Sequence, residues 1–165
     1  MPSGKQKILL IDDEKDFCHL LKLNLEEQGP YEVLVATDPR VGIRVAHQRR
    51  PDVILLDIVM PGMRGFEVLE KLKADRKTLS IPVLMLSALN DGNSKQQAIS
   101  RYVDGYIEKP VNMDLLKSRI EGSLVTKKVK KGQGRSLGRG LRILRAFFKQ
   151  FLARCELRLI APPKA

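Results

Sequence analysis

The first apolar run of the chain reads Ile8-Leu9-Leu10-Ile11-Asp12-Asp13-Glu14, four branched residues that lead directly into three acids. Comparable runs occur further along, and most of them end close to a polar residue. They are Val53-Ile54-Leu55-Leu56 before Asp57, Val83-Leu84-Met85-Leu86 before Ser87, Tyr106-Ile107 shortly before Lys109, and Val33-Leu34-Val35-Ala36 after the turn Gly29-Pro30. Because none of these runs alternates with polar residues, they predict strands covered on both faces, as in a parallel sheet.

Segments with helical spacing of apolar residues separate the predicted strands. The apolar positions are Phe17, Leu20, Leu21 and Leu25 in the first segment, Phe66, Leu69 and Leu72 in a later one, and Val111, Leu115, Leu116 and Ile120 after Pro110. Asp91 is suited to cap a further helix that runs to about Tyr102. Strands that alternate with helices predict an α/β domain with right-handed crossovers, with five of each ending near Leu124.

The net charge of +11 is unevenly distributed. Residues 1–125 hold 18 Lys and Arg against 18 Asp and Glu, whereas residues 126–165 hold 12 basic residues and one acid, Glu156. We therefore divide the chain into a neutral domain over 1–125, a basic glycine-containing linker over 126–140, and a basic amphipathic helix over 141–165.

The basic tail leaves several roles open. It could be an extension that packs on the domain or mediates self-association, for example in a homodimer. Its Leu and Phe face and its Arg and Lys flank also suit an anionic membrane surface. Contact with nucleic acid is less favoured, because the tail is too short for a winged or tri-helical DNA-binding domain and no recognition helix with a partner helix is visible.

The remaining composition points to a cytoplasmic protein. Cys18 and Cys155 lie far apart, without metal-ligand or C-x-x-C spacing, so we expect unpaired thiols in a reducing compartment. Cys18 is expected to be a small buried helix residue. We identify no signal peptide, and no apolar stretch approaches the roughly 20 residues that span a bilayer.

Polar side chains stand at or just after the ends of the predicted strands, namely Asp12, Asp13, Asp57, Ser87 and Lys109. In an open parallel sheet these positions lie along one edge, where such folds bind ligands. Three close carboxylates raise each other's pKa unless a cation lies among them, and short oxygen ligands suit Mg²⁺. A divalent ion and a lysine together suit a phosphoryl dianion, which a carboxylate can attack to form an acyl phosphate.

The motifs that carry these residues resemble the receiver domain of two-component response regulators, of the chemotaxis-regulator-like kind. They read Lys7-Ile8-Leu9-Leu10-Ile11-Asp12-Asp13-Glu14, Leu56-Asp57-Ile58-Val59-Met60-Pro61-Gly62, Met85-Leu86-Ser87-Ala88 and Gly105-Tyr106-Ile107-Glu108-Lys109-Pro110. The resemblance covers about residues 5–124. It implies a flavodoxin-like, doubly wound, five-stranded parallel sheet with strand order 2-1-3-4-5, to which this chain adds a basic C-terminal helical extension.

The resemblance also implies a role for each matching residue at the acidic end of the site. Asp57 would be the nucleophile and the site of phosphorylation. Asp13 would bind Mg²⁺ directly and Asp12 mainly through water. The main-chain carbonyl of Val59 would be a further metal ligand.

At the phosphate-binding end, Ser87 would donate a hydrogen bond to one phosphoryl oxygen and Lys109 would pair with another. Tyr106 would be a switch that turns inward when Ser87 moves towards the phosphate. A cis bond between Lys109 and Pro110 would aim the ammonium into the site.

The implied function is a phosphorylation-dependent switch that takes a phosphoryl group from a histidine kinase or a phosphotransfer protein. Such a domain is not an enzyme in the turnover sense, although it catalyses its own phosphorylation and hydrolysis. Val59 and Leu89 carry no polar group to orient water, so we expect slow self-dephosphorylation. With no recognisable DNA-binding output domain, we expect the chain to act by binding another protein.

Two rival interpretations are less favoured. Haloacid-dehalogenase-like phosphatases also form an aspartyl phosphate, but they need a second Asp two residues after the nucleophile, where this chain has Val59. Alternatively the domain would be an idle scaffold for the basic tail, although nothing in the acidic set departs from a working receiver.

Overall fold

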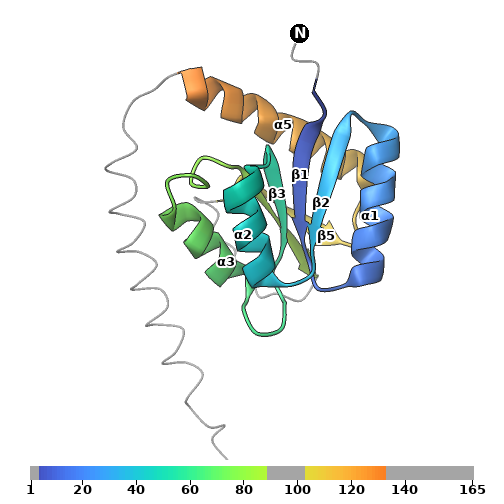
Figure 1. Ribbon diagram of the computed structural model, residues 1–165. Coiled ribbons are helices and arrows are strands. Elements are labelled where there is room, and N and C mark those ends of the chain that lie inside the picture. The colour runs from blue at the N-terminus through green and yellow to red at the C-terminus, as the bar shows by residue number, and fades with distance from the viewer. Residues whose placement is uncertain (1–3, 89–102, 133–165) are drawn as a thin grey trace, which may run out of the picture. The chain divides into compact units, whose positions relative to one another are not determined.

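The computed structural model describes residues 4–88 and 103–132, with only the backbone for 127–132. Within these residues the strands form one parallel sheet in the order β2-β1-β3-β4-β5 (Figure 1). This order confirms the predicted flavodoxin-like fold. The strands are β1 (Gln6–Ile11), β2 (Tyr31–Ala36), β3 (Val53–Asp57), β4 (Val83–Ala88) and β5 (Gly105–Lys109).

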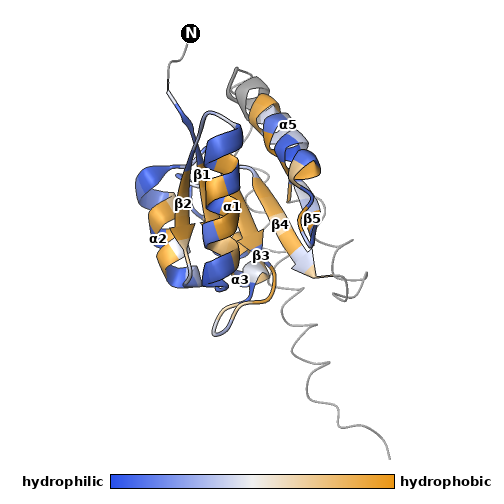
Figure 2. Ribbon diagram, turned by 90° about the vertical axis from the view of Figure 1, so that its right-hand side faces the viewer, coloured by the Kyte–Doolittle hydropathy of each residue, from blue (hydrophilic) through white to orange (hydrophobic). Residues whose placement is uncertain are grey.

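Helices cover both faces of the sheet. They are α1 (Lys15–Gln28), α2 (Pro39–Arg49), α3 (Gly65–Ala74) and α5 (Met113–Gly132). Helices α1 and α5 lie on one face, and α2 and α3 pack together on the other (Figures 1 and 2). The helix expected from Asp91 to about Tyr102 lies outside the described residues.

Burial along the strands follows from this layering. The apolar residues of β1, β3 and β4 that lie in the middle of the sheet are almost all inaccessible to solvent. Strand β2, at one edge, alternates between buried and more exposed positions. The continuous apolar runs of β1, β3 and β4 therefore mark central strands, as a two-sided cover requires. The prediction that Val33–Ala36 is covered on both faces is wrong, because β2 lies at the edge of the sheet and Val35 is 38% exposed.

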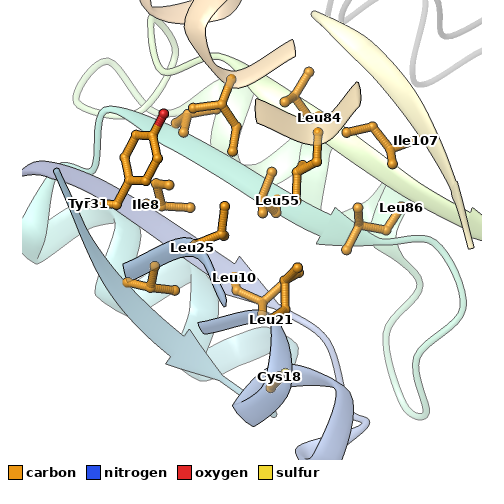
Figure 3. Close-up of a cluster of buried hydrophobic side chains, with 14 of the residues drawn as sticks. Ile8, Leu10, Cys18, Leu21, Leu25, Tyr31, Leu55, Leu84, Leu86 and Ile107 are labelled. Carbon is orange, nitrogen blue, oxygen red and sulfur yellow. The ribbon is translucent and has the colours of Figure 1, made fainter. Parts of the chain in front are cut away.

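The core beneath α1 and α5 shows which residues of each helix face the sheet (Figure 3). On α1 the buried positions are Cys18, Leu21 and Leu25, as predicted for Cys18, whereas Leu20 is 62% exposed. On α5 they are Leu116, Ile120 and Leu124, and Leu115 is 45% exposed. The apolar positions with helical spacing thus include Leu20 and Leu115, which lie outside the buried face, because each is one residue, or about 100°, around the helix from a buried leucine.

The C-terminal boundary also differs from the expectation. Helix α5 continues to Gly132, so the first seven residues of the expected linker, Thr126–Gly132, are helical. Lysine is a good helix former, and no glycine or proline interrupts this stretch before Gly132. The rest of the expected linker and the basic helix over 141–165 lie outside the described residues. Among the residues that are described, no helix combines the length and apolar content needed to cross a membrane.

Strand register brings the predicted site residues to one level of the sheet. Ile11 pairs with Leu56, so the next residues, Asp12 and Asp57, stand side by side. Asp57 pairs with Leu86, which places Ser87 one residue further along. Ala88 pairs with Lys109, which ends β5 at the same edge.

Gly65 begins α3 directly against the main chain of Asp57. Its N–H donates a hydrogen bond to the carbonyl of Ile58 at 2.9 Å. A Cβ atom at position 65 would collide with the carbonyl oxygen of Asp57, which is backbone and has no flexible end to move aside. Glycine is therefore required here for a close approach between helix and strand.

Two glycine substitutions should have opposite effects on stability. Gly65→Ala is expected to lower the free energy of unfolding by about 2 kcal/mol, because the collision forces a backbone shift. Gly122→Ala, on α5, meets nothing within 4 Å and should raise that free energy by roughly 0.5–1 kcal/mol through helix propensity. Urea denaturation of both variants measures the difference. Equal stability of the two variants would show that Gly65 can be replaced without a collision.

Candidate functional site

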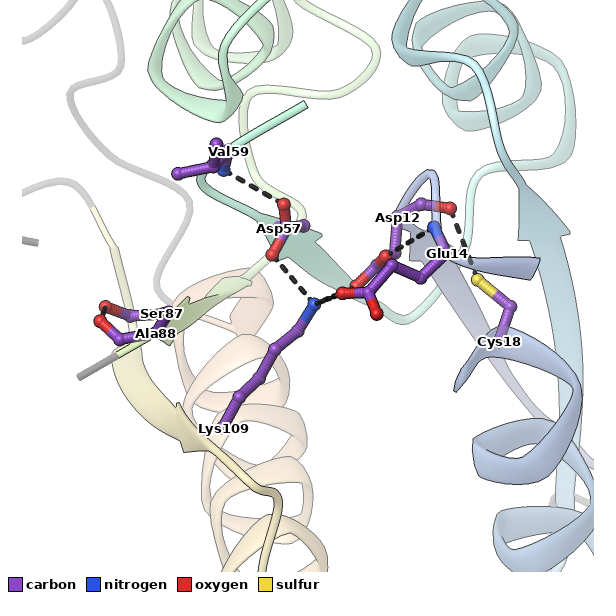
Figure 4. Close-up of polar contacts among 8 residues, drawn as sticks. All are labelled: Asp12, Glu14, Cys18, Asp57, Val59, Ser87, Ala88 and Lys109. Carbon is purple, nitrogen blue, oxygen red and sulfur yellow. Dashed lines mark hydrogen bonds and ion pairs between the residues drawn. The ribbon is translucent and has the colours of Figure 1, made fainter. Parts of the chain in front are cut away.

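The ends of β1, β3 and β5 bring two acids and a lysine into direct contact. The Nζ atom of Lys109 lies 2.7 Å from Oδ2 of Asp12 and 3.0 Å from Oδ1 of Asp57 (Figure 4). Both carboxylates are almost completely buried. The convergence expected from strand order is thus present in the structure.

Burial and charge oppose each other at these groups. Burial raises the pKa of both Asp12 and Asp57, and the nearby Lys109 only partly counteracts this. For Lys109 itself, burial would lower the pKa, but hydrogen bonding to Asp12, Glu14 and Asp57 outweighs burial and leaves the pKa raised. The lysine therefore stays charged, and the carboxylates still lack enough positive charge around them.

The carboxylates form a candidate metal centre. Asp12, Asp13 and Asp57 each offer an oxygen, and these atoms lie within 4.8 Å of one another. Oδ2 of Asp12 is buried, and its close partner is the Lys109 ammonium at 2.7 Å, which also contacts Glu14 and Asp57. One ammonium does not neutralise this many acids, so a cation bound there would lower the cost of burying them. Short oxygen ligands of this kind fit a hard divalent cation.

Asp57 is held in a fixed orientation by groups on either side. The main-chain N–H of Val59 donates to Oδ2 of Asp57 at 2.9 Å, while Oδ1 faces Lys109. The Val59 side chain is 62% exposed. The implied role of the Val59 carbonyl as a metal ligand stays a prediction.

The other predicted residues lie around this centre. Ser87 is buried, and its hydroxyl donates to the carbonyl of Ala88 at 3.1 Å (Figure 4). Tyr106 is half-buried, and burial raises the pKa of its hydroxyl. The Lys109-Pro110 peptide bond is cis. The roles of Ser87 and Tyr106 as a phosphate ligand and a switch stay predictions.

Two residues at the start of α1 reach the site but were not singled out from the sequence. Glu14 accepts a hydrogen bond from Nζ of Lys109 at 3.0 Å. The ring of Phe17 lies with its centroid 4.5 Å from the same ammonium, a cation–π contact. Glu14 could have been suspected because it continues the acidic run, but nothing in the sequence distinguishes Phe17 from an ordinary core residue.

The arrangement suits phosphoryl chemistry on a carboxylate. Three carboxylates and one ammonium leave an excess of negative charge that a divalent ion would neutralise. A phosphoryl group placed there would meet a carboxylate nucleophile, a cation and an ammonium. Phosphoryl transfer requires mainly such positioning and charge neutralisation.

Comparison with known proteins agrees with this chemistry. The family model described as the response regulator receiver domain matches residues 8–121. The DNA-binding dual master transcriptional regulator RpaA of Synechocystis is 38% identical over 118 residues, which cover 72% of this chain and 48% of that protein. The phosphate regulon transcriptional regulatory protein PhoB of Pseudomonas aeruginosa is 37% identical over 117 residues, or 71% of this chain and 51% of that protein. The chain thus spans about half the length of these curated relatives.

Solved structures give the same result for the fold. A response regulator receiver domain protein from Clostridium thermocellum has a TM-score of 0.69 at 30% identity and covers 75% of this chain and 98% of that one. The chemotaxis protein CheY4 of Vibrio cholerae has a TM-score of 0.67 at 30% identity, and the match covers 73% of this chain and 100% of that one. With the fold, the acidic centre and the family model in agreement, this chain belongs to the response regulator receiver family of two-component systems.

Proposed function

We propose that this chain is a phosphorylation-dependent response regulator that accepts a phosphoryl group on Asp57. The observation that carries the proposal is the position of Asp57. Its carboxylate is buried, lies 3.0 Å from the Lys109 ammonium, and offers an oxygen within 4.8 Å of oxygens of Asp12 and Asp13. A carboxylate nucleophile, a counter-charge and a candidate metal centre thus meet at one edge of the sheet.

Transfer would follow from this geometry. The donor is a phospho-histidine on a histidine kinase or a phosphotransfer protein. A carboxylate oxygen of Asp57 forms a bond to phosphorus as the bond from phosphorus to the imidazole nitrogen breaks, and the imidazole leaves with its electron pair. Lys109 neutralises a phosphoryl oxygen and Ser87 donates a hydrogen bond to another. Mg²⁺, held by Asp12, Asp13, Asp57 and the Val59 carbonyl, would supply further charge neutralisation.

The output is proposed to be a population shift. Ser87 and Tyr106 would rearrange on phosphorylation and change the surface around β5 and α5, which a partner protein would recognise. We place the protein in the cytoplasm and treat the transfer as self-catalysed, without turnover of a separate substrate.

A second candidate output is control of transcription. The curated relatives at 37–38% identity are transcriptional regulators by name, and one of them is DNA-binding. The excess basic charge of residues 126–165 would favour contact with a polyanion. Fluorescence-anisotropy titration with duplex DNA, with and without phosphorylation, distinguishes this output from protein–protein recognition.

Mg²⁺ should stabilise the domain through Asp13. At ten times its Kd, Mg²⁺ is expected to raise the free energy of unfolding of the wild type by about 1.4 kcal/mol. Asp13→Asn should lose most of this gain. In EDTA, the same variant should be no less stable than the wild type, because one repelling charge is gone. Urea denaturation with MgCl₂ or EDTA provides the measurement.

Asp75→Asn is the matched control for this experiment. Asp75 lies at the far end of α3 from the site, where its carboxylate is 3.5 Å from His47. This variant should respond to Mg²⁺ as the wild type does. A full Mg²⁺ response in Asp13→Asn would contradict the assigned metal centre.

Acetyl phosphate should label Asp57 directly. With radiolabelled acetyl phosphate and Mg²⁺, the wild type and Asp75→Asn are expected to take up label, whereas Asp57→Asn should not, because an amide is a poor nucleophile. Autoradiography of rapidly quenched samples measures the uptake. Equal labelling of wild type and Asp57→Asn would overturn the proposed function.

The phosphorylated form should persist for minutes or longer. Val59 offers no polar group to orient water, and Leu89, the other apolar residue expected beside the phosphate, lies outside the described residues. Val59→Asn should shorten the lifetime several-fold. Val125→Asn, a change at a similarly exposed position on α5 (61% against 62%), should leave it unchanged. Loss of label from the wild type within a few seconds would contradict this expectation.

A further inference from the structure

Glu14 holds the N-cap position of α1 but makes no capping hydrogen bond with its side chain. Its carboxylate instead accepts a hydrogen bond from Nζ of Lys109 at 3.0 Å. An N-cap side chain ordinarily accepts from the second or third N–H of its own helix. The Glu14 side chain therefore binds Lys109 on the other side of the site and does not cap the helix that follows it.

The carboxylates around Lys109 differ sharply in exposure. The side chain of Asp12 is 0% exposed and that of Asp57 is 8% exposed, whereas that of Glu14 is 64% exposed. A lysine ammonium has three N–H donors, and these three carboxylates lie within 3.0 Å of it. An arriving phosphoryl oxygen can be bound by Lys109 only if one of the present contacts is given up.

Glu14 is the contact that can be released. Asp12 and Asp57 are fixed by their strands and by main-chain donors, since Glu14 N–H donates to Oδ1 of Asp12 and Val59 N–H donates to Oδ2 of Asp57, each at 2.9 Å. The Glu14 carboxylate is exposed to water, and an ion pair in such a place is weak. The ring of Phe17 stays beside the ammonium at 4.5 Å and would keep Lys109 at the site after Glu14 leaves.

We propose that Glu14 is a positioning residue that holds Lys109 in the unphosphorylated domain and competes with the phosphoryl group for it. The carboxylate occupies the N–H that a phosphoryl oxygen would take, and phosphorylation displaces it into solvent. This inference rests on the proposed function, because it assumes that Lys109 binds a phosphoryl oxygen. It follows that Glu14 lowers the affinity of the site for a phosphoryl group.

The test uses beryllium fluoride with saturating Mg²⁺ as a mimic of the phosphoryl group on Asp57, followed by ¹⁹F NMR on the full chain. Glu14→Ala should lower the half-saturating concentration of beryllium fluoride about twofold to fivefold, the size of one exposed ion pair. Without beryllium fluoride, its free energy of unfolding should fall by the small amount that corresponds to this fold-change, and at saturating beryllium fluoride it should equal the wild-type value. A merely structural role for Glu14 would lower the free energy of unfolding equally with and without beryllium fluoride and leave the half-saturating concentration as it is.

Two further variants separate contact from charge. Glu14→Asp keeps the charge but shortens the side chain, so it should show the same gain as Glu14→Ala. Asp16→Asn removes an exposed charge in the same turn of α1, and Asp16 forms none of the ion pairs recorded among the described residues. It should leave the half-saturating concentration at the wild-type value.

The possible results have distinct meanings. Unchanged affinity in Glu14→Ala, an equal gain in Asp16→Asn, or weaker Mg²⁺ binding in Glu14→Ala without a gain for beryllium fluoride would each overturn the competition by Glu14. If the wild type binds no beryllium fluoride while Asp57→Asn takes up acetyl phosphate label as well as the wild type, the proposed function fails instead.

Discussion

The ion pairs of Lys109 join the ends of three strands that are far apart in the sequence. Asp12 follows β1, Asp57 ends β3 and Lys109 ends β5, and their charged atoms meet within 3.0 Å. Such a meeting is possible only because parallel strands in this order all end at one edge of the sheet. The buried apolar residues of the strands stabilise the fold, and the carboxyl ends of the strands carry the residues of the candidate site.

Burying ionised Asp12 and Asp57 side by side at this edge costs free energy in the domain without a bound cation. Burial raises the pKa of Asp12 and Asp57, and one lysine does not offset the cost of bringing the acids together. Clusters of this kind are common at functional sites, where stability is given up for reactivity. The same imbalance would favour binding of a cation, and of a phosphoryl group that arrives with one.

Much of the fold and the centre of the site could be predicted from the sequence. Continuous apolar runs identify the strands, and the polar residues at or just after four of these runs identify the edge that carries the candidate site. The buried face of each helix is harder to predict from the sequence, because a pair such as Leu20-Leu21 offers two adjacent apolar residues. Only the packed structure shows that Leu21 faces the sheet. The contacts of Glu14 and Phe17 with Lys109 depend on where α1 begins relative to β5, which no local pattern encodes.

Gly65 has a mechanical consequence for the loop between β3 and α3. The close approach of Gly65 to the Asp57 carbonyl and the hydrogen bond from Gly65 to Ile58 tie the two ends of residues 58–64 together. Because its two ends are held together in this way, the loop resists any change that would move the start of α3 away from the end of β3. A group attached to Asp57 would therefore meet resistance if it pushed α3 away from β3. The absence of a single methyl group at position 65 thus ties the start of α3 to the main chain of the proposed phosphorylation site.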